Sequence, residues 1–122
     1  MTKRKERTVQ DCLFCRIASG DQEADVVHTS DHVVAFRDVN PQAPVHILII
    51  PKEHIESARS LRDKQGDVLA DMFVAAAHLA RANEIDRSGW RVVTNVGPDA
   101  GQSVHHLHFH LLGGRQMRWP PG

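Results

Sequence analysis

An alternating pattern around residue 108 most constrains how this chain can fold. The stretch reads His106-Leu107-His108-Phe109-His110-Leu111-Leu112. A period of two is typical of a β-strand, which sends successive side chains to opposite faces. We therefore expect a strand over residues 104–112, with its odd-numbered apolar residues in a core and its three imidazoles in a row about 6.6–7 Å apart on the other face. Such a row can bind a metal, hold a phosphate or attack one, and the alternative is a merely solvated face.

Length and charge exclude several classes of protein. The chain has 122 residues, which is one domain, and its 15 basic and 15 acidic residues balance. Without a basic field, nucleic acid is not an expected partner. Residues 1–10 are expected to form a flexible basic arm, and they lack the apolar segment of a secretory signal. No stretch is long and apolar enough for a membrane span, so we expect a cytoplasmic protein with reduced cysteines.

The remaining patterns predict an α+β domain over residues 11–122. Two segments are expected to be helical, 11–20 and 63–85, the longer one because apolar residues recur at helical spacing. Strands are expected over 26–28, 33–38, 45–50, 90–96 and 104–112. Short connections between the strands favour an antiparallel sheet, and no βαβ alternation supports a dinucleotide-binding domain.

Four groups of residues together resemble one known family. They are the His-φ-His-φ-His-φ-φ stretch, Pro41-Gln42-Ala43-Pro44-Val45-His46, Gly101-Gln102-Ser103-Val104, and the ending Gly113-Gly114-Arg115-Gln116-Met117-Arg118-Trp119-Pro120-Pro121-Gly122. The chain is similar to the histidine-triad (HIT) superfamily, and the ending is similar to its Hint branch. The resemblance implies a five-stranded antiparallel sheet with one long and one short helix. It also implies a homodimer in which two sheets join into ten strands.

The resemblance implies a purine nucleoside phosphoramidase that works through a covalent nucleotidyl-histidine. His108 would be the nucleophile, His110 would contact the phosphate, and His46 and Ser103 would complete the catalytic group. A neutral imidazole can attack phosphorus, and the product is labile to water. The alternatives are a dinucleoside polyphosphate hydrolase of the same superfamily, and a nucleotide-binding regulatory protein with little catalysis. Arg118 departs from the most familiar members, which leaves the preferred leaving group open.

The same resemblance implies a site for a purine nucleotide of the AMP or GMP type. Its expected residues are Leu13, Phe14, Ile17, Phe36, Asp38, Val39, Asn95, Gln102, Ser103, His108 and His110. Asp38 would accept hydrogen bonds from the ribose diol, although an aspartate at a strand end is also common in turns. The apolar members would hold the base, and ordinary core packing is the alternative. For the polar residues at 95, 102 and 103, the alternative to phosphate contact is turn chemistry.

A second candidate site begins with Cys12 and Cys15, a C-x-x-C pair. A redox role for this spacing needs a thioredoxin-like βαβ context, which the pattern lacks. Structural zinc needs two further ligands, and His54 and His106 are the candidates. The alternative is a pair of small buried thiols. No catalytic metal is expected.

Overall fold

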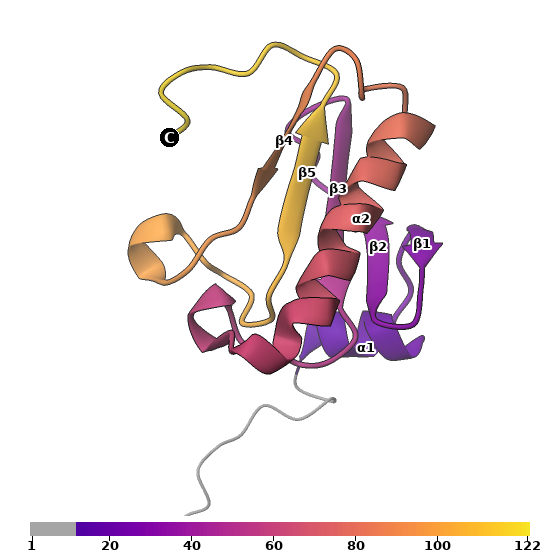
Figure 1. Cartoon of the computed structure of the whole chain (residues 1–122), viewed down its shortest axis with the longest axis vertical. Helices are drawn as coiled ribbons and strands as arrows, with labels where there is room; N and C mark the ends of the chain where they lie inside the picture. The colour runs from indigo at the N-terminus through magenta and orange to yellow at the C-terminus, as the bar shows by residue number, and fades with distance from the viewer. Residues whose placement is uncertain (1–11) are drawn as a thin grey trace, which may run out of the picture.

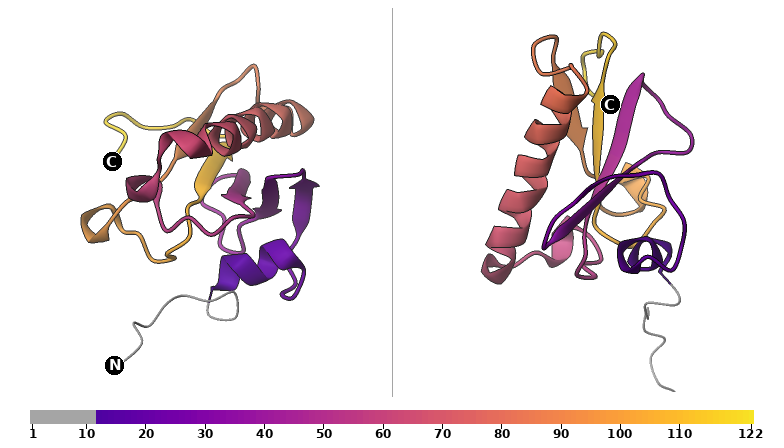
Figure 2. Two further views of the ribbon diagram at one scale, coloured as in Figure 1. Left: turned by 60° about the horizontal axis from the view of Figure 1, so that its bottom comes forward. Right: turned by 90° about the vertical axis from the view of Figure 1, so that its right-hand side faces the viewer.

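Two helices lie on opposite faces of a five-stranded antiparallel sheet (Figures 1 and 2). The computed structural model describes residues 12–122; the expected arm over residues 1–10 lies outside them. The elements are α1 Leu13–Ser19, β1 Val26–Thr29, β2 Val33–Arg37, β3 Val45–Pro51, η2 Ala58–Ser60, η3 Asp63–Gln65, α2 Gly66–Ala82, β4 Trp90–Val93, η4 Pro98–Ala100 and β5 Phe109–Gly113. The strand order is β1-β2-β3-β5-β4, and the predicted α+β protomer with a five-stranded antiparallel sheet, one long helix and one short helix is confirmed.

Local chemistry sets the ends of both helices. Sγ of Cys12 accepts a hydrogen bond from the backbone N–H of Cys15 and so caps α1, which ends at Gly20 with a φ of 87°. The predicted long helix divides into η3 and α2, and α2 ends before Glu84, whose φ is 60°. Within residues 12–122, no helix has both the length and the apolar character needed to cross a bilayer.

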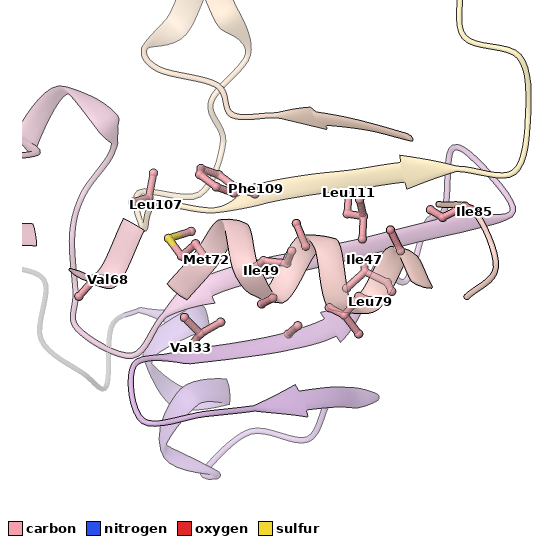
Figure 3. Close-up of a cluster of buried hydrophobic side chains, with 14 of the residues drawn as sticks. Val33, Ile47, Ile49, Val68, Met72, Leu79, Ile85, Leu107, Phe109 and Leu111 are labelled. Atoms are coloured by element: carbon pink, nitrogen blue, oxygen red, sulfur yellow. The ribbon is translucent and has the colours of Figure 1, made fainter. Parts of the chain in front are cut away.

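The alternation of β3 divides the interior into two apolar clusters. Ile47 and Ile49 face α2 and lie in the larger cluster, part of which Figure 3 shows. Leu48 and Ile50 face α1 and lie in the smaller cluster. His46 has the parity of this second pair, so the strand presents it on the α1 face. The sheet therefore has a packed face under α2 and a partly open face beside α1.

The predicted strand over 104–112 is wrong for its first half, because β5 begins only at Phe109. The ladder between β3 and β5 ends at the pair Ile49–Phe109. Before that pair, the Leu107 N–H donates to the carbonyl of Ile55 at 2.6 Å instead of to a strand partner. The predicted alternation nevertheless holds: Leu107, Phe109 and Leu111 lie in the cluster under α2. On the other side, Phe14 of α1 contacts the rings of His106 and His108, and His108 contacts His110.

The predicted strand over 90–96 is also shorter than expected, because β4 ends at Val93. Oγ1 of Thr94 donates to the backbone carbonyl of His108 at 2.8 Å, a side-chain bond in place of a continued ladder. The chain then leaves the sheet and forms the loop that carries Asn95 and Ser103. Both shortened strands thus border the same loop, which lies at one end of the candidate site.

Candidate functional site

A cavity of about 710 Å³ lies on the α1 face of the sheet. One end is apolar and is lined by Leu13, Phe14, Ile17, Phe36 and Leu48. The other end is polar and is lined by Asn95, Gly101, Ser103, His108 and His110. Asp38 lies in the wall between β2 and the following loop, and Val39 is fully exposed at the rim. An apolar slot that ends in a few convergent polar groups is typical of a small-molecule site.

One backbone contact fixes the tautomer of His108. Its Nδ1 lies 2.7 Å from the backbone carbonyl oxygen of His106. A carbonyl can only accept, so Nδ1 of the neutral ring carries the proton and Nε2 keeps a free lone pair. The ring is buried and meets the edge of Phe14, with 5.2 Å between ring centroids. In its neutral form, His108 therefore has its proton on Nδ1 and the lone pair of Nε2 available as a nucleophile.

A chain of hydrogen bonds assigns the tautomers of His46 and His110. The backbone N–H of Gln42 donates to Nδ1 of His46 at 3.0 Å, which leaves the proton of the neutral ring on Nε2. This Nε2 lies 2.9 Å from Nδ1 of His110 and donates to it. Nδ1 of His110 is then an acceptor, so Nε2 of His110 carries a proton. The polar end of the cavity thus contains a second imidazole in the donor tautomer.

Burial keeps both of these histidines neutral at neutral pH. Desolvation, with smaller contributions from His108 and His46, lowers the pKa of His110 to about 4. Desolvation also lowers the pKa of His46, and nearby Asp38 partly opposes that effect. Oδ2 of Asp38 is 3.4 Å from Nε2 of His46, farther than Nδ1 of His110, so the bond between the two histidines is the principal one.

Unlike the other polar residues of the predicted site, Gln102 bonds to the backbone of neighbouring loops. Its Oε1 accepts from the backbone N–H of Gly97 at 3.0 Å, and its Nε2 donates to the carbonyls of Glu56 and Val104 at 3.0 and 3.1 Å. Gln102 does not line the cavity; it braces the loop that carries Ser103. Sequence reasoning also missed Leu48 in the wall, although its distance of two residues from His46 on one strand could have indicated it.

A second cluster, next to His108, is formed by Cys12, Cys15, His54 and His106. Their ligand atoms all lie within 4.8 Å of one another. The distances are 3.3 Å from Cys12 Sγ to His106 Nδ1, 3.2 Å from Cys15 Sγ to His54 Nδ1, and 3.5 Å from Cys15 Sγ to His106 Nδ1. Neighbouring ligands of a tetrahedral zinc ion are about 3.5 Å apart, so these four residues fit zinc.

The surroundings of this cluster also fit a metal site. Nε2 of His106 lies 2.9 Å from the carbonyl of Pro51, an outer contact that orients the ring and leaves Nδ1 for a metal. Burial lowers the pKa of His106 to about 4, which keeps the ring neutral. Burial and the neighbouring Cys12 raise the pKa of Cys15 to about 12, so without a cation this thiol stays protonated. Four protein ligands leave no open coordination position, which is typical of a structural zinc site.

Comparison with known proteins identifies the family. A model of the HIT domain matches residues 19–117. The chain belongs to the HIT-domain family. An uncharacterized HIT-like protein of Synechococcus elongatus is 44% identical over 113 residues, which cover 93% of this chain and 98% of that protein. The 14 kDa zinc-binding protein of Brassica juncea is 43% identical over 114 residues, which cover 92% and 100% of the two chains.

Solved structures of HIT proteins share this fold closely. A HIT family hydrolase from Legionella pneumophila superposes with a TM-score of 0.89 at 50% identity, covering 91% of this chain and 99% of the other. A histidine triad protein from Clostridium difficile superposes with a TM-score of 0.85 at 39% identity, covering 97% of both chains. This HIT protein thus has the fold of HIT family hydrolases. It also has a Cys/His cluster that could hold a metal ion, and the relative from Brassica juncea is named a zinc-binding protein.

Proposed function

We propose that this HIT protein is a purine nucleoside phosphoramidase of the Hint branch. The observation that carries the proposal is the geometry of His108, whose Nδ1 is bonded to a carbonyl while Nε2 remains free in a cavity of nucleotide size. A fixed neutral imidazole is suited to nucleophilic attack on phosphorus. The neighbouring donor on His110 is suited to the phosphoryl oxygens, where negative charge develops in the transition state.

The proposed nucleotide lies along the cavity with its base at the apolar end. Leu13, Phe14, Ile17, Phe36 and Val39 are assigned to the purine. Asp38 is assigned to the ribose diol, because one of its oxygens accepts from the Asn40 N–H at 2.8 Å while the other has acceptor capacity left. Asn95 and Ser103 are assigned to the phosphate end, and Gln102 supports them through the loop. This placement brings the α-phosphorus next to His108 and His110.

The reaction proceeds in two displacements at phosphorus. Nε2 of His108 forms a bond to phosphorus as the bond from phosphorus to the leaving nitrogen breaks. The Ser103 hydroxyl passes a proton from solvent to this nitrogen, which departs as an amine. Water then attacks phosphorus, the bond to His108 breaks, and the proton of that water returns to solvent. Nucleoside monophosphate is released, and His108 regains its lone pair. His46 acts through His110, whose tautomer it fixes.

We assign a structural zinc ion to Cys12, Cys15, His54 and His106. This ion would hold α1 against the sheet. A homodimer with its two sheets joined is proposed as the working unit, and β4 at one edge of the sheet is available for that pairing. We further propose that residues 11–122 act as a single domain in the cytoplasm, where the two free cysteines remain available to a metal.

Turnover of adenosine 5′-tryptamine phosphoramidate tests the proposed activity. The protein should release AMP, and His108→Ala should reduce the rate at least about a thousandfold because the nucleophile is gone. A matched control is His105→Ala, since that ring lies three residues earlier and does not line the cavity. Acid quenching during turnover should trap AMP on His108, detectable by mass spectrometry of the peptide. Full turnover by His108→Ala would exclude the proposed mechanism.

A further inference from the structure

A groove of about 410 Å³ lies between α2 and the end of β1 with the turn that follows it. Three of the nine histidines of the chain line it, namely His28, His32 and His78. None of them has a part in the proposed reaction or in the Cys/His cluster. Strand β1 is the edge of the sheet opposite β4, as Figure 1 shows, so the groove is also remote from the edge that we assign to pairing between subunits.

A β-bulge turns His28 toward this groove. Val26 pairs with Phe36, which belongs to the apolar cluster beside α1. His28 pairs with Ala35, which belongs to the cluster under α2, and the register shifts between the two pairs. Residues two apart in a regular strand share a face, so without the bulge His28 would lie on the same face as Val26. The bulge thus places the His28 ring on the α2 face, and bulges are a common device for re-aiming a side chain.

The His28 ring meets the ring of His78, which comes from α2. The two ring centroids are 5.6 Å apart and the ring planes are tilted by 51°, so the rings do not stack. Among residues 12–122, neither imidazole has a hydrogen-bond or ion-pair partner. Two imidazoles on one metal ion, with metal–nitrogen bonds of about 2.0–2.1 Å, have centroids about 4.5–5.5 Å apart. The half-buried His28 and the exposed His78 are therefore close to the separation that a shared ion requires.

The side chain of Ser30 is a second, independent indication of a ligand in this groove. Ser30 lines the groove, and its Oγ is buried without a hydrogen-bond partner in the described part of the chain. A buried polar atom ordinarily has such a partner, because its desolvation is otherwise uncompensated. Two histidines leave coordination positions of an ion open to water. A water molecule held by the ion would supply the partner that the Ser30 hydroxyl lacks.

The other polar side chains of the groove favour a cation. The carboxylates of Asp31 and Asp71 line it, together with one guanidinium group, that of Arg81. Nδ1 of His32 lies 2.6 Å from Oδ2 of Asp71, so these two groups bind each other, and the pair of free imidazoles remains for a metal. Imidazole nitrogen suits zinc, copper and nickel, whereas magnesium and calcium prefer oxygen ligands. The donor set thus indicates a divalent transition metal.

We propose that His28 and His78 form a second metal site, which takes a divalent transition-metal ion such as Ni²⁺, Cu²⁺ or Zn²⁺. The ion joins the edge strand β1 to α2 and completes its coordination with water. This inference does not depend on the proposed function. Two protein ligands hold an ion more weakly than the four of the Cys/His cluster, so gel filtration removes this ion and leaves that of the cluster.

Calorimetric titration of the gel-filtered protein with Ni²⁺ alone, at neutral pH, tests the proposal. The variants are His28→Gln and His78→Gln. The matched control is His105→Gln, which removes an imidazole that does not line the groove. Loss of an outer partner of a metal ligand usually costs tenfold to a hundredfold in affinity, so loss of either ligand should weaken Ni²⁺ binding at least about tenfold. Both variants should lose the same single equivalent of Ni²⁺, whereas His105→Gln should keep it.

Thermal unfolding provides a second readout. A hundredfold excess of Ni²⁺ over its Kd should raise the melting temperature of the original protein by at least about 3 °C, and that of His78→Gln by much less. Ni²⁺ that binds equally well to all variants would lie elsewhere, for example at Asp38, His46 and His110, and would overturn the proposal. Failure of the original protein to bind Ni²⁺, or separate losses that add up to two equivalents, would overturn it as well.

A crystal soaked with Ni²⁺ and measured at the nickel absorption edge gives a test that needs no variant, should either substitution impair folding. An anomalous peak between the rings of His28 and His78 is the expected result. A peak only at another site would overturn the proposal.

Discussion

Nδ1 of His108 lies 2.7 Å from the backbone carbonyl oxygen of His106, whose own ring belongs to the Cys/His cluster. One residue therefore serves two sites: its side chain faces the cysteines, and its main chain orients the proposed nucleophile. The contact joins the position of α1, through Cys12 and Cys15, to the chemistry of the cavity. A change in the cluster should consequently reach His108 without any change in the residues that hold the nucleotide.

Removal of zinc is expected to lower both stability and turnover. Cys15→Ser should reduce zinc from about one per chain to almost none. The melting temperature should fall by at least about 10 °C, because binding to the native state stabilises it by about 4 kcal/mol at a thousandfold excess over Kd. Elemental analysis and calorimetry measure both effects. His28→Gln, outside the cluster, is the control, and a Cys15→Ser protein that retains stoichiometric zinc would contradict the assignment.

Replacement of His46 is expected to lower kcat more than it weakens nucleotide binding. His46→Asn removes the donor to Nδ1 of His110, so the proton of His110 is no longer fixed on Nε2. We expect kcat to fall about tenfold to a hundredfold, with the Kd of AMP within about threefold. Gln42→Ala is the matched control, because its backbone N–H still donates to His46. A His46→Asn protein with unchanged kcat would show that the tautomer does not matter.

Asp38 is expected to distinguish ribose from sugars that lack the diol. Asp38→Asn replaces a charged acceptor, and hydrogen bonds to charged groups contribute about 1.5–3 kcal/mol. AMP binding should therefore weaken at least about tenfold, whereas binding of 2′,3′-dideoxy-AMP should change little. Calorimetric Kd values for both ligands, on both proteins, measure this difference. An equal loss of affinity for the two ligands would mean that Asp38 supports the loop through Asn40 and does not contact the sugar.

The parts of the fold that follow from local pattern were predictable. The strongly apolar run over residues 45–50 indicated a strand that carries His46, and β3 is such a strand, with nearly all its residues buried. The C-x-x-C spacing, with two histidines far along the chain, indicated the cluster that the structure brings together. For β3 and for the C-x-x-C pair the signal lies in a few neighbouring residues, whereas the choice of His54 and His106 as the other two ligands was supported by the family resemblance.

The late start of β5, which shortens the predicted histidine strand at its N-terminal end, was not predictable in the same way. The pattern has period two from residue 106 to 111, yet β5 begins only at Phe109, and before it the His106 ring bonds to the carbonyl of Pro51. The competing partners lie more than 50 positions away, and no local pattern reports them. Gln102 is similar, because its bonds to Glu56 and Gly97 depend on how two distant loops meet. Tertiary contacts decide these positions over local propensity.

The end of β5 packs closely against Ile85, which predicts a specific stability defect. A Cβ atom at Gly113 would collide with Cδ1 of Ile85 and lie 3.1 Å from its Cβ. Gly113→Ala should therefore lower the free energy of unfolding by about 1–3 kcal/mol, the usual cost of overpacking. Ile85→Val removes Cδ1 and should restore part of the loss in the double variant. Strictly additive effects in urea unfolding would contradict the predicted contact.

The metal-free protein should lose stability as the pH falls from about 6.5 to about 4. In the native state burial lowers the pKa of His110 to about 4, while the unfolded ring titrates near 6.5. Between these values the unfolded state binds the extra proton, so the free energy of unfolding decreases by up to about 3 kcal/mol. His110→Asn should flatten this dependence, measured by urea unfolding at pH 7 and pH 4.5 in the presence of a chelator.

His32→Gln is the control. Asp71 raises the pKa of His32, so this ring stabilises the folded protein at acidic pH, and its removal should not flatten the loss of stability. The same slope in His110→Asn as in the original protein would mean that burial of His110 does not disfavour its charged form.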